Sequence, residues 1–149
     1  MVLCGAIAWV VAYAVAAGII ALPSSLRVML VASLAALGLL FNLWPKLVFG
    51  RVGTTVNPLR PASSRVLVIT GLHRLSRNPM YLGHALMLVA WACWLQHPAA
   101  LVGAPLYMAY VTRYQILPEE RALSATFGAA YEAYQARVGR WLWCTESPR

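Results

Sequence analysis

Charge, and acidic charge above all, is scarce in this sequence. The chain has no aspartate and only four acidic residues, against twelve Lys and Arg, and charged residues make up 11% of its 149 positions. Soluble domains carry roughly 25% charged residues, so this composition cannot cover the surface of a water-soluble globule. Because 61% of the residues are hydrophobic and the mean hydropathy is +0.67, we expect much of the surface to face lipid.

Other features that the sequence lacks exclude further classes of function. The three cysteines, Cys4, Cys93 and Cys144, have neither metal-binding nor disulfide spacing. The net charge of +8 could indicate nucleic acid or anionic lipid, but no charged face lies outside the apolar segments. We therefore expect membrane lipid as a partner, no nucleic acid and no metal centre.

Four apolar segments predict transmembrane helices, at residues 3–22, 28–44, 80–95 and 99–117. At about 1.5 Å per residue, such segments reach roughly across a 30 Å hydrocarbon core. None of these segments alternates apolar and polar residues as a barrel strand does, so helices are the expected form. The first segment has no basic residues before it, which favours a retained span over a signal peptide.

The distribution of Lys and Arg predicts the orientation of these spans. Basic residues concentrate in the 46–79 segment and in the C-terminal segment, whereas the two other connections hold one arginine between them. The positive-inside rule then places both termini and the 46–79 loop in the cytoplasm. The prediction is an all-α polytopic membrane protein, forming a single domain over residues 1–149. The short, Ala- and Arg-rich chain favours a bacterial inner membrane.

The C-terminal half contains signals for a helical hairpin and a further helix. Only residues 96–98 separate the third and fourth spans, so these should form a tight hairpin. Pro105 is expected to kink the fourth span or leave a carbonyl free. Pro118 suits the first turn of a new helix over residues 118–141. Apolar residues recur there at three- and four-residue steps, which predicts an amphipathic cytoplasmic helix; they are Leu123, Phe127, Tyr131, Tyr134, Val138 and Trp141.

Two polar clusters could carry chemistry. The first runs from Thr70 to His84, where a snorkelling basic edge would account for the arginines but not for Tyr81, Gly83 and His84 inside a span. The second holds Arg113, Glu119 and Glu120 at the end of the fourth span. Taken alone, either acid is accounted for as a favourable charge at a helix N-terminus. The hairpin, however, returns both clusters to one membrane face.

The motifs in these clusters resemble a known family of membrane enzymes. Arg77-Asn78-Pro79-Met80-Tyr81-Leu82-Gly83, then Glu119-Glu120, then Phe127-Gly128 with Tyr131 and Tyr134, resemble the isoprenylcysteine carboxyl methyltransferases, which are related to phospholipid N-methyltransferases. The resemblance covers roughly residues 54–141. Asn78 stands where the family usually has histidine, so this position cannot titrate as an acid or base.

The resemblance implies an S-adenosylmethionine-dependent methyltransferase whose lipophilic or lipid acceptor enters from the bilayer. It implies cofactor binding at nine positions: Arg77, Asn78, Pro79, Tyr81, Leu82, Gly83, His84, Glu119 and Glu120. Arginine suits the carboxylate of the cofactor, and the acids suit its ammonium or ribose. Arg113 is the predicted catalytic residue, as the anchor of a carboxylate acceptor.

Two alternatives stay open on the sequence. If the acceptor is a phospholipid amine, a base must take its proton, and His84 or His73 would serve. The chain could also be a non-catalytic membrane scaffold or binding subunit that kept the fold. The sequence assigns neither the acceptor nor the oligomeric state.

Overall fold

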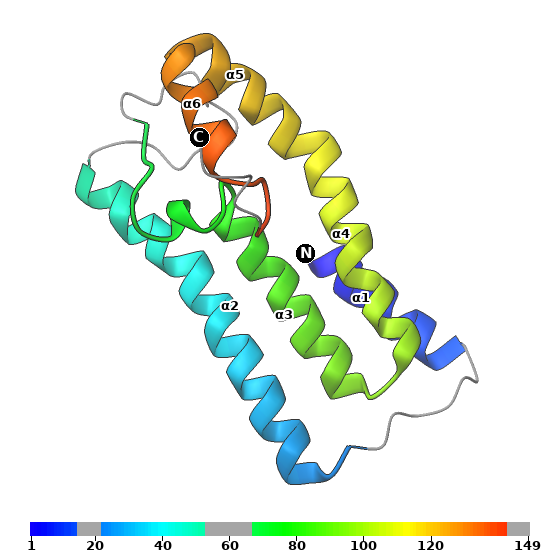
Figure 1. Cartoon of the computed structure of the whole chain (residues 1–149). Helices are drawn as coiled ribbons and strands as arrows, with labels where there is room; N and C mark the ends of the chain where they lie inside the picture. Colours follow the sequence, from blue (N-terminus) through cyan, green and yellow to red (C-terminus); the bar gives the residue numbers. More distant parts are fainter. Residues whose placement is uncertain (15–21, 53–66, 143–149) are drawn as a thin grey trace. The chain divides into compact units, whose positions relative to one another are not determined.

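The computed structural model describes residues 1–14, 22–52 and 67–142, and these are mostly helical, with no strand among them (Figure 1). The predicted all-α class is therefore confirmed. The α-helices are, in order, α1 (Val2–Ala14), α2 (Ser24–Val52), α3 (Pro79–Leu95), α4 (Gly103–Val111), α5 (Leu117–Phe127) and α6 (Ala129–Arg137).

The chain divides into two compact units. The first combines Met1–Leu40 with Gly83–Tyr110, and the second combines Phe41–Leu82 with Val111–Arg149. The division falls within α2 and α3, so each of these helices contributes residues to both units. The single domain over the whole chain stays a prediction.

Helix α2 is longer than the sequence indicated. The predicted span ends before Pro45, but the helix continues through this proline to Val52. Pro45 cannot donate a backbone hydrogen bond, yet its ring is fully buried, and this packing offsets the lost bond. The prediction that residues 46–79 form one loop is wrong for its first seven residues, and residues 53–66 lie outside the described part.

Among the described residues, one helical stretch is long and apolar enough to cross a membrane, Ser24–Val48 in α2. Helix α3 is apolar but shorter, with 17 residues, and its bounds match the predicted third span to within one residue. Helix α1 begins the predicted first span, of which residues 15–21 are outside the described part. The four-span topology stays a prediction.

The predicted fourth span contains three kinds of helix. A 3-10 helix, Pro98–Val102, leads into α4, and a π-helical turn, Thr112–Ile116, joins α4 to α5. Pro105 lies in the first turn of α4, where a missing N–H is not needed within the helix. The α-helix begins only two residues earlier, and the expected kink or free carbonyl at Pro105 stays a prediction.

The predicted C-terminal helix over residues 118–141 is two helices. It breaks at Gly128, whose φ of 50° and ψ of −128° disfavour residues with a Cβ. Of the six predicted apolar positions, all but Trp141 nevertheless gather, since Tyr131, Tyr134 and Val138 form a buried cluster. Leu67, Leu123 and Phe127 pack against this cluster.

The first unit is built on close approaches of small residues. Ala8 of α1 packs with Ala92 of α3 and with Ala100 of the 3-10 helix. Gly38 of α2 lies so close to α3 that an added Cβ would be 2.8 Å from the Gly83 carbonyl oxygen. Small residues such as glycine let two helix backbones approach closely. In lipid this close packing matters, because the hydrophobic effect does not drive helices together there.

Polar contacts connect two helices at the predicted outer end of the first unit. The Arg27 guanidinium donates to the Gln96 side chain and lies 5.2 Å from the centre of the Trp94 ring. Gln96 has a φ of 54° and also donates to the Leu22 carbonyl. These contacts tie the start of α2 to the turn after α3, and they account for the arginine in that short connection.

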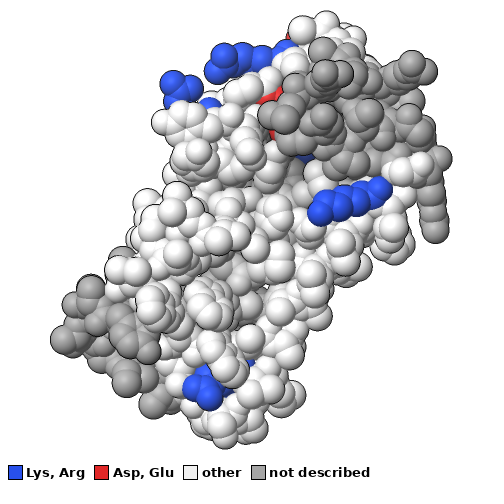
Figure 2. Space-filling model, turned by 180° about the vertical axis from the view of Figure 1, so that it is seen from behind, with Lys and Arg blue, Asp and Glu red and all other residues white. Residues whose placement is uncertain are grey.

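Much of the described surface is apolar. On the face shown in Figure 2, most of the described side chains are uncharged. Leu39, Leu40, Leu43 and Leu47 of α2 are each half exposed or nearly so, or more. An exposed apolar surface of this kind is expected of a chain that faces lipid.

The Gly38 contact gives a test of helix packing. Gly38→Ala should lower the thermal stability of the detergent-purified protein by about 1–3 kcal/mol, because overpacking exceeds the gain of about 1 kcal/mol in helix propensity. Gly50→Ala on the same helix is the matched control, since no atom lies within 4 Å of its added Cβ. Equal melting of the two variants would contradict the packing.

Candidate active site

The motif at the start of α3 is fixed by the first helical turn. Asn78 precedes the helix, its carbonyl accepts from the Leu82 N–H at 3.1 Å, and Pro79 is the first helical residue. Proline suits this position because its φ is already helical and its missing N–H is not needed. The side chain of Asn78 therefore points to other partners than its own helix.

These partners belong to a C-terminal strap, which we define as residues 138–140. The Arg77 backbone N–H donates to the Gly139 carbonyl at 3.0 Å. The Arg140 carbonyl accepts from Ser76 Oγ at 3.2 Å and from Asn78 Nδ2 at 3.1 Å. Ser76 is fully buried and also accepts from the Asn78 N–H. The strap thus holds the backbone that carries the motif.

A buried carboxylate lies between two arginines in the same unit. The Glu120 side chain is 10% exposed, and its Oε1 lies 2.9 Å from Arg77 Nη1. Arg140 binds both oxygens, with Nε 3.0 Å from Oε1 and Nη2 2.8 Å from Oε2. We call Arg77, Glu120 and Arg140 the triad. The two guanidinium groups leave it with one excess positive charge.

Arg77 keeps hydrogen-bonding capacity in this arrangement. Its side chain is 11% exposed and bonds Tyr131. Its Nε and Nη1 atoms are buried, and neither directs an N–H at an acceptor among the described residues, although Nη1 is within ion-pair distance of Glu120. Buried donors of this kind are costly unless a ligand or water completes them.

Glu119 lies beside the triad. Its Oε1 accepts from the Tyr81 hydroxyl at 2.7 Å. Burial raises the pKa of the Glu119 carboxyl, the Tyr81 hydrogen bond lowers it, and the neighbouring charge of Glu120 raises it again. An acid held in this way is available to an ammonium or a hydroxyl donor.

The two tyrosines of the Phe-Gly motif, Tyr131 and Tyr134, are buried in the same unit as the triad. Tyr134 donates to the His73 carbonyl at 2.7 Å, inside the cluster that α6 buries. Burial lowers the pKa of His73 to about 4, so this imidazole stays neutral at physiological pH. The buried His73 imidazole is therefore a weak base, and its surroundings suit a residue with a structural role.

The structure brings seven of the nine predicted cofactor residues into the second unit. They are Arg77, Asn78, Pro79, Tyr81, Leu82, Glu119 and Glu120. Gly83 and His84 belong to the first unit, where His84 Nδ1 lies 3.0 Å from the Tyr107 hydroxyl with the two rings edge to face. Arg113 is exposed on the π-helical turn.

Sequence reasoning missed Ser76 and Arg140. Arg140 was counted only among the cytoplasmic charges, because it is 20 positions from its partner Glu120. A signal existed: a buried acid needs a cation, and the C-terminal arginines were the candidates. Nothing in the spacing singles out Arg140 from Arg137, which instead donates to a carbonyl of its own helix.

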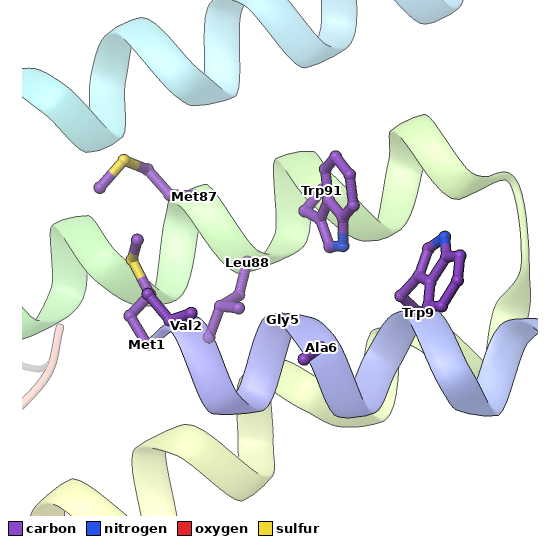
Figure 3. A pocket seen from close by; sticks show the side chains of 8 residues that line it. All are labelled: Met1, Val2, Gly5, Ala6, Trp9, Met87, Leu88 and Trp91. Carbon is purple, nitrogen blue, oxygen red and sulfur yellow. The ribbon is translucent and has the colours of Figure 1, made fainter.

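The first unit contains an apolar pocket of about 520 Å³, lined mainly by α1 and α3 (Figure 3). Trp9 and Trp91 lie toward one end of the pocket, and Met1, Met87 and Leu88 lie toward the other end. Its lining holds no charged side chain, so it lacks the groups that an amino-acid or nucleoside ligand needs.

A model of the phospholipid methyltransferase family matches residues 26–130. The chain belongs to this family. The resemblance that the motifs indicated is thereby confirmed at the level of the family. Membership implies methyltransferase activity and a membrane association, and such enzymes generally use S-adenosylmethionine as methyl donor.

Another comparison adds similarity without an activity. The chain is 38% identical over 63 residues to an uncharacterized protein of Haemophilus influenzae, a match that covers 42% of this chain and 100% of that protein. No solved structure matches the chain.

The residues of the second unit fit S-adenosylmethionine. The excess positive charge of the triad and the buried Arg77 donors complement a carboxylate. Glu119 and Tyr81 complement an ammonium or ribose hydroxyls. The second unit therefore contains both signs of charge that an amino-acid group requires.

The raised pKa of Glu119 predicts a stability cost. Between the ordinary value of 4.5 and the higher folded value, the folded state binds more protons than the unfolded state, so stability falls as pH rises through that window. Glu119→Gln removes this titration and keeps an oxygen for Tyr81. We expect the variant to melt above the wild type at pH 8 and the difference to shrink at pH 4. A difference that does not change with pH would contradict the shift.

Proposed function

We propose that this chain transfers a methyl group from S-adenosylmethionine to a lipophilic acceptor that enters from the bilayer. The observation that carries the proposal is the triad, which places buried, incompletely bonded arginine donors at the start of α3. The motif residues beside it lie within the segment that the family model matches.

The residues would divide the work of holding the cofactor. Arg77 would bind the carboxylate, and Glu119 the ammonium or a ribose hydroxyl, with Tyr81 orienting that acid. The bound cofactor supplies an electrophilic methyl group on a sulfonium centre. Such a reaction depends mainly on in-line positioning and exclusion of water, and proximity can provide about 7–11 kcal/mol. Asn78 would act by anchoring the strap, as its bond to Arg140 supports.

Cofactor binding tests the proposal against a non-catalytic scaffold. Calorimetric titration with S-adenosylhomocysteine should give a dissociation constant in about the 1 μM to 1 mM range of enzyme ligands. Arg77→Gln and Glu119→Gln should each weaken it about tenfold or more, because each removes a charged contact with the ligand.

Matched controls lie close by in the chain. Arg74→Gln and Glu132→Gln remove the same charges from exposed positions and should bind as the wild type does. Folded wild-type protein that binds no S-adenosylhomocysteine would favour the scaffold. Equal losses in the controls would point to a general charge effect.

The proposed acceptor is a lipophilic carboxylate anchored by Arg113. This arginine is exposed on a π-helical turn, a local form that is frequent at functional sites. The family description favours a second candidate, a phospholipid amine. In that case His84 is the better base, because His73 is buried and has a pKa of about 4.

The chemistry of the product separates these acceptors. Membranes containing the protein would be incubated with methyl-labelled cofactor, and the lipid extract treated with alkali. A methyl ester releases labelled methanol, whereas an N-methyl group keeps its label. We expect base-labile product, reduced about tenfold or more by Arg113→Gln and unchanged by Arg121→Gln. Base-stable label that survives Arg113→Gln would establish the amine candidate.

A further inference from the structure

Arg140 lies beyond the segment that the family model matches, which ends at residue 130. It nevertheless makes several polar contacts with the motif region. Its carbonyl accepts from Ser76 and Asn78, and its guanidinium binds Glu120. The strap therefore meets the motif through both backbone and side chain.

The two arginines of the triad hold Glu120 in different ways. Arg140 places Nε and Nη2 on the two carboxylate oxygens, the fork geometry that arginine forms with carboxylates. Arg77 approaches Oε1 through Nη1 alone, without a directed hydrogen bond. Arg140 thus forms directed hydrogen bonds to both oxygens of Glu120, whereas Arg77 contributes an ion pair.

This difference has a consequence for Arg77. Were Arg140 absent, Glu120 could rotate to meet the Arg77 guanidinium squarely and occupy its donors. With Arg140 in place, the carboxylate is fixed, and the Arg77 Nε and Nη1 donors keep no acceptor among the described residues. Glu120 still attracts Arg77 and so holds the guanidinium in position.

We propose that Arg140 is a positioning residue, which engages Glu120 so that Arg77 presents Nε and Nη1, which have no directed hydrogen bond among the described residues, to the carboxylate of S-adenosylmethionine. The inference rests on the proposed function and adds a division of labour within the triad. Arg140 makes no contact with the ligand itself. Its side chain is 35% exposed, so it closes the triad from the solvent side.

The competing interpretation is that Arg140 only clasps the strap to the motif. A clasp would support binding of every cofactor analogue equally, because it acts on the fold. A positioning residue acts on one group of the ligand. The two roles therefore differ in ligand selectivity, and selectivity does not depend on how stable a variant is.

The test compares two ligands, S-adenosylhomocysteine and its decarboxylated analogue, which keeps the adenosine and the ammonium. Arg140→Gln should weaken S-adenosylhomocysteine about tenfold or more and change the analogue by less than about twofold. Arg140→Lys keeps the charge but cannot form the fork, so it should show the same selectivity with a smaller loss. Arg137→Gln on α6 is the matched control and should bind both ligands as the wild type does.

Each other outcome is decisive. Equal weakening of both ligands by Arg140→Lys would assign Arg140 to the fold and overturn the inference. Unchanged binding of both ligands by the two Arg140 variants would overturn it as well. If the wild type binds neither ligand, the proposed function itself fails, which is a different result from wild-type binding without selectivity in the variants.

Discussion

The burial of Glu120 is the constraint on which the second unit depends. A carboxylate removed from water is unstable unless cations and hydrogen bonds replace its hydration, and removing one partner of such a group costs about 3–5 kcal/mol. Glu120 obtains these partners from two distant parts of the chain, Arg77 before α3 and Arg140 after α6. The strap contacts, the break at Gly128 and the tyrosine cluster all serve to bring these parts together.

A site built this way carries its functional groups at a cost in stability. Glu119 is half-buried beside another acid, and both its burial and that neighbouring charge raise its pKa, while Arg77 keeps buried donors without directed acceptors. Natural proteins accept such local penalties where a ligand will relieve them. The tyrosines around the triad provide compensating burial, since Tyr131 and Tyr134 are almost entirely inside.

Much of this fold was predictable because lipid imposes simple rules. Helix α3 follows its apolar segment to within one residue, and Pro79 marks its start. Predictions failed where one residue overrode a local rule. Buried Pro45 lets α2 continue to Val52, and Gly128 divides a helix whose apolar periodicity reads as continuous.

The motif residues of the site were predictable from the sequence, but the residues of the strap that contact them were not. Arg77, Tyr81, Glu119 and Glu120 were identified from residue type and position, and the structure places them in one unit. Ser76 could not be identified, because its role arises from a contact across more than 60 residues, and the charge of Glu120 pointed to the C-terminal arginines without selecting Arg140 among them. Hydrogen bonds to backbone carbonyls, such as those of the strap, leave no signature in a sequence.

The most direct measurement is a crystal structure of the protein, grown from lipid, with S-adenosylhomocysteine bound. The account predicts the ligand carboxylate within hydrogen-bond distance of Arg77 Nε or Nη1, with Arg140 still forked on Glu120. A ligand bound elsewhere, or a carboxylate held by other groups while the Arg77 donors stay without a partner, would contradict it.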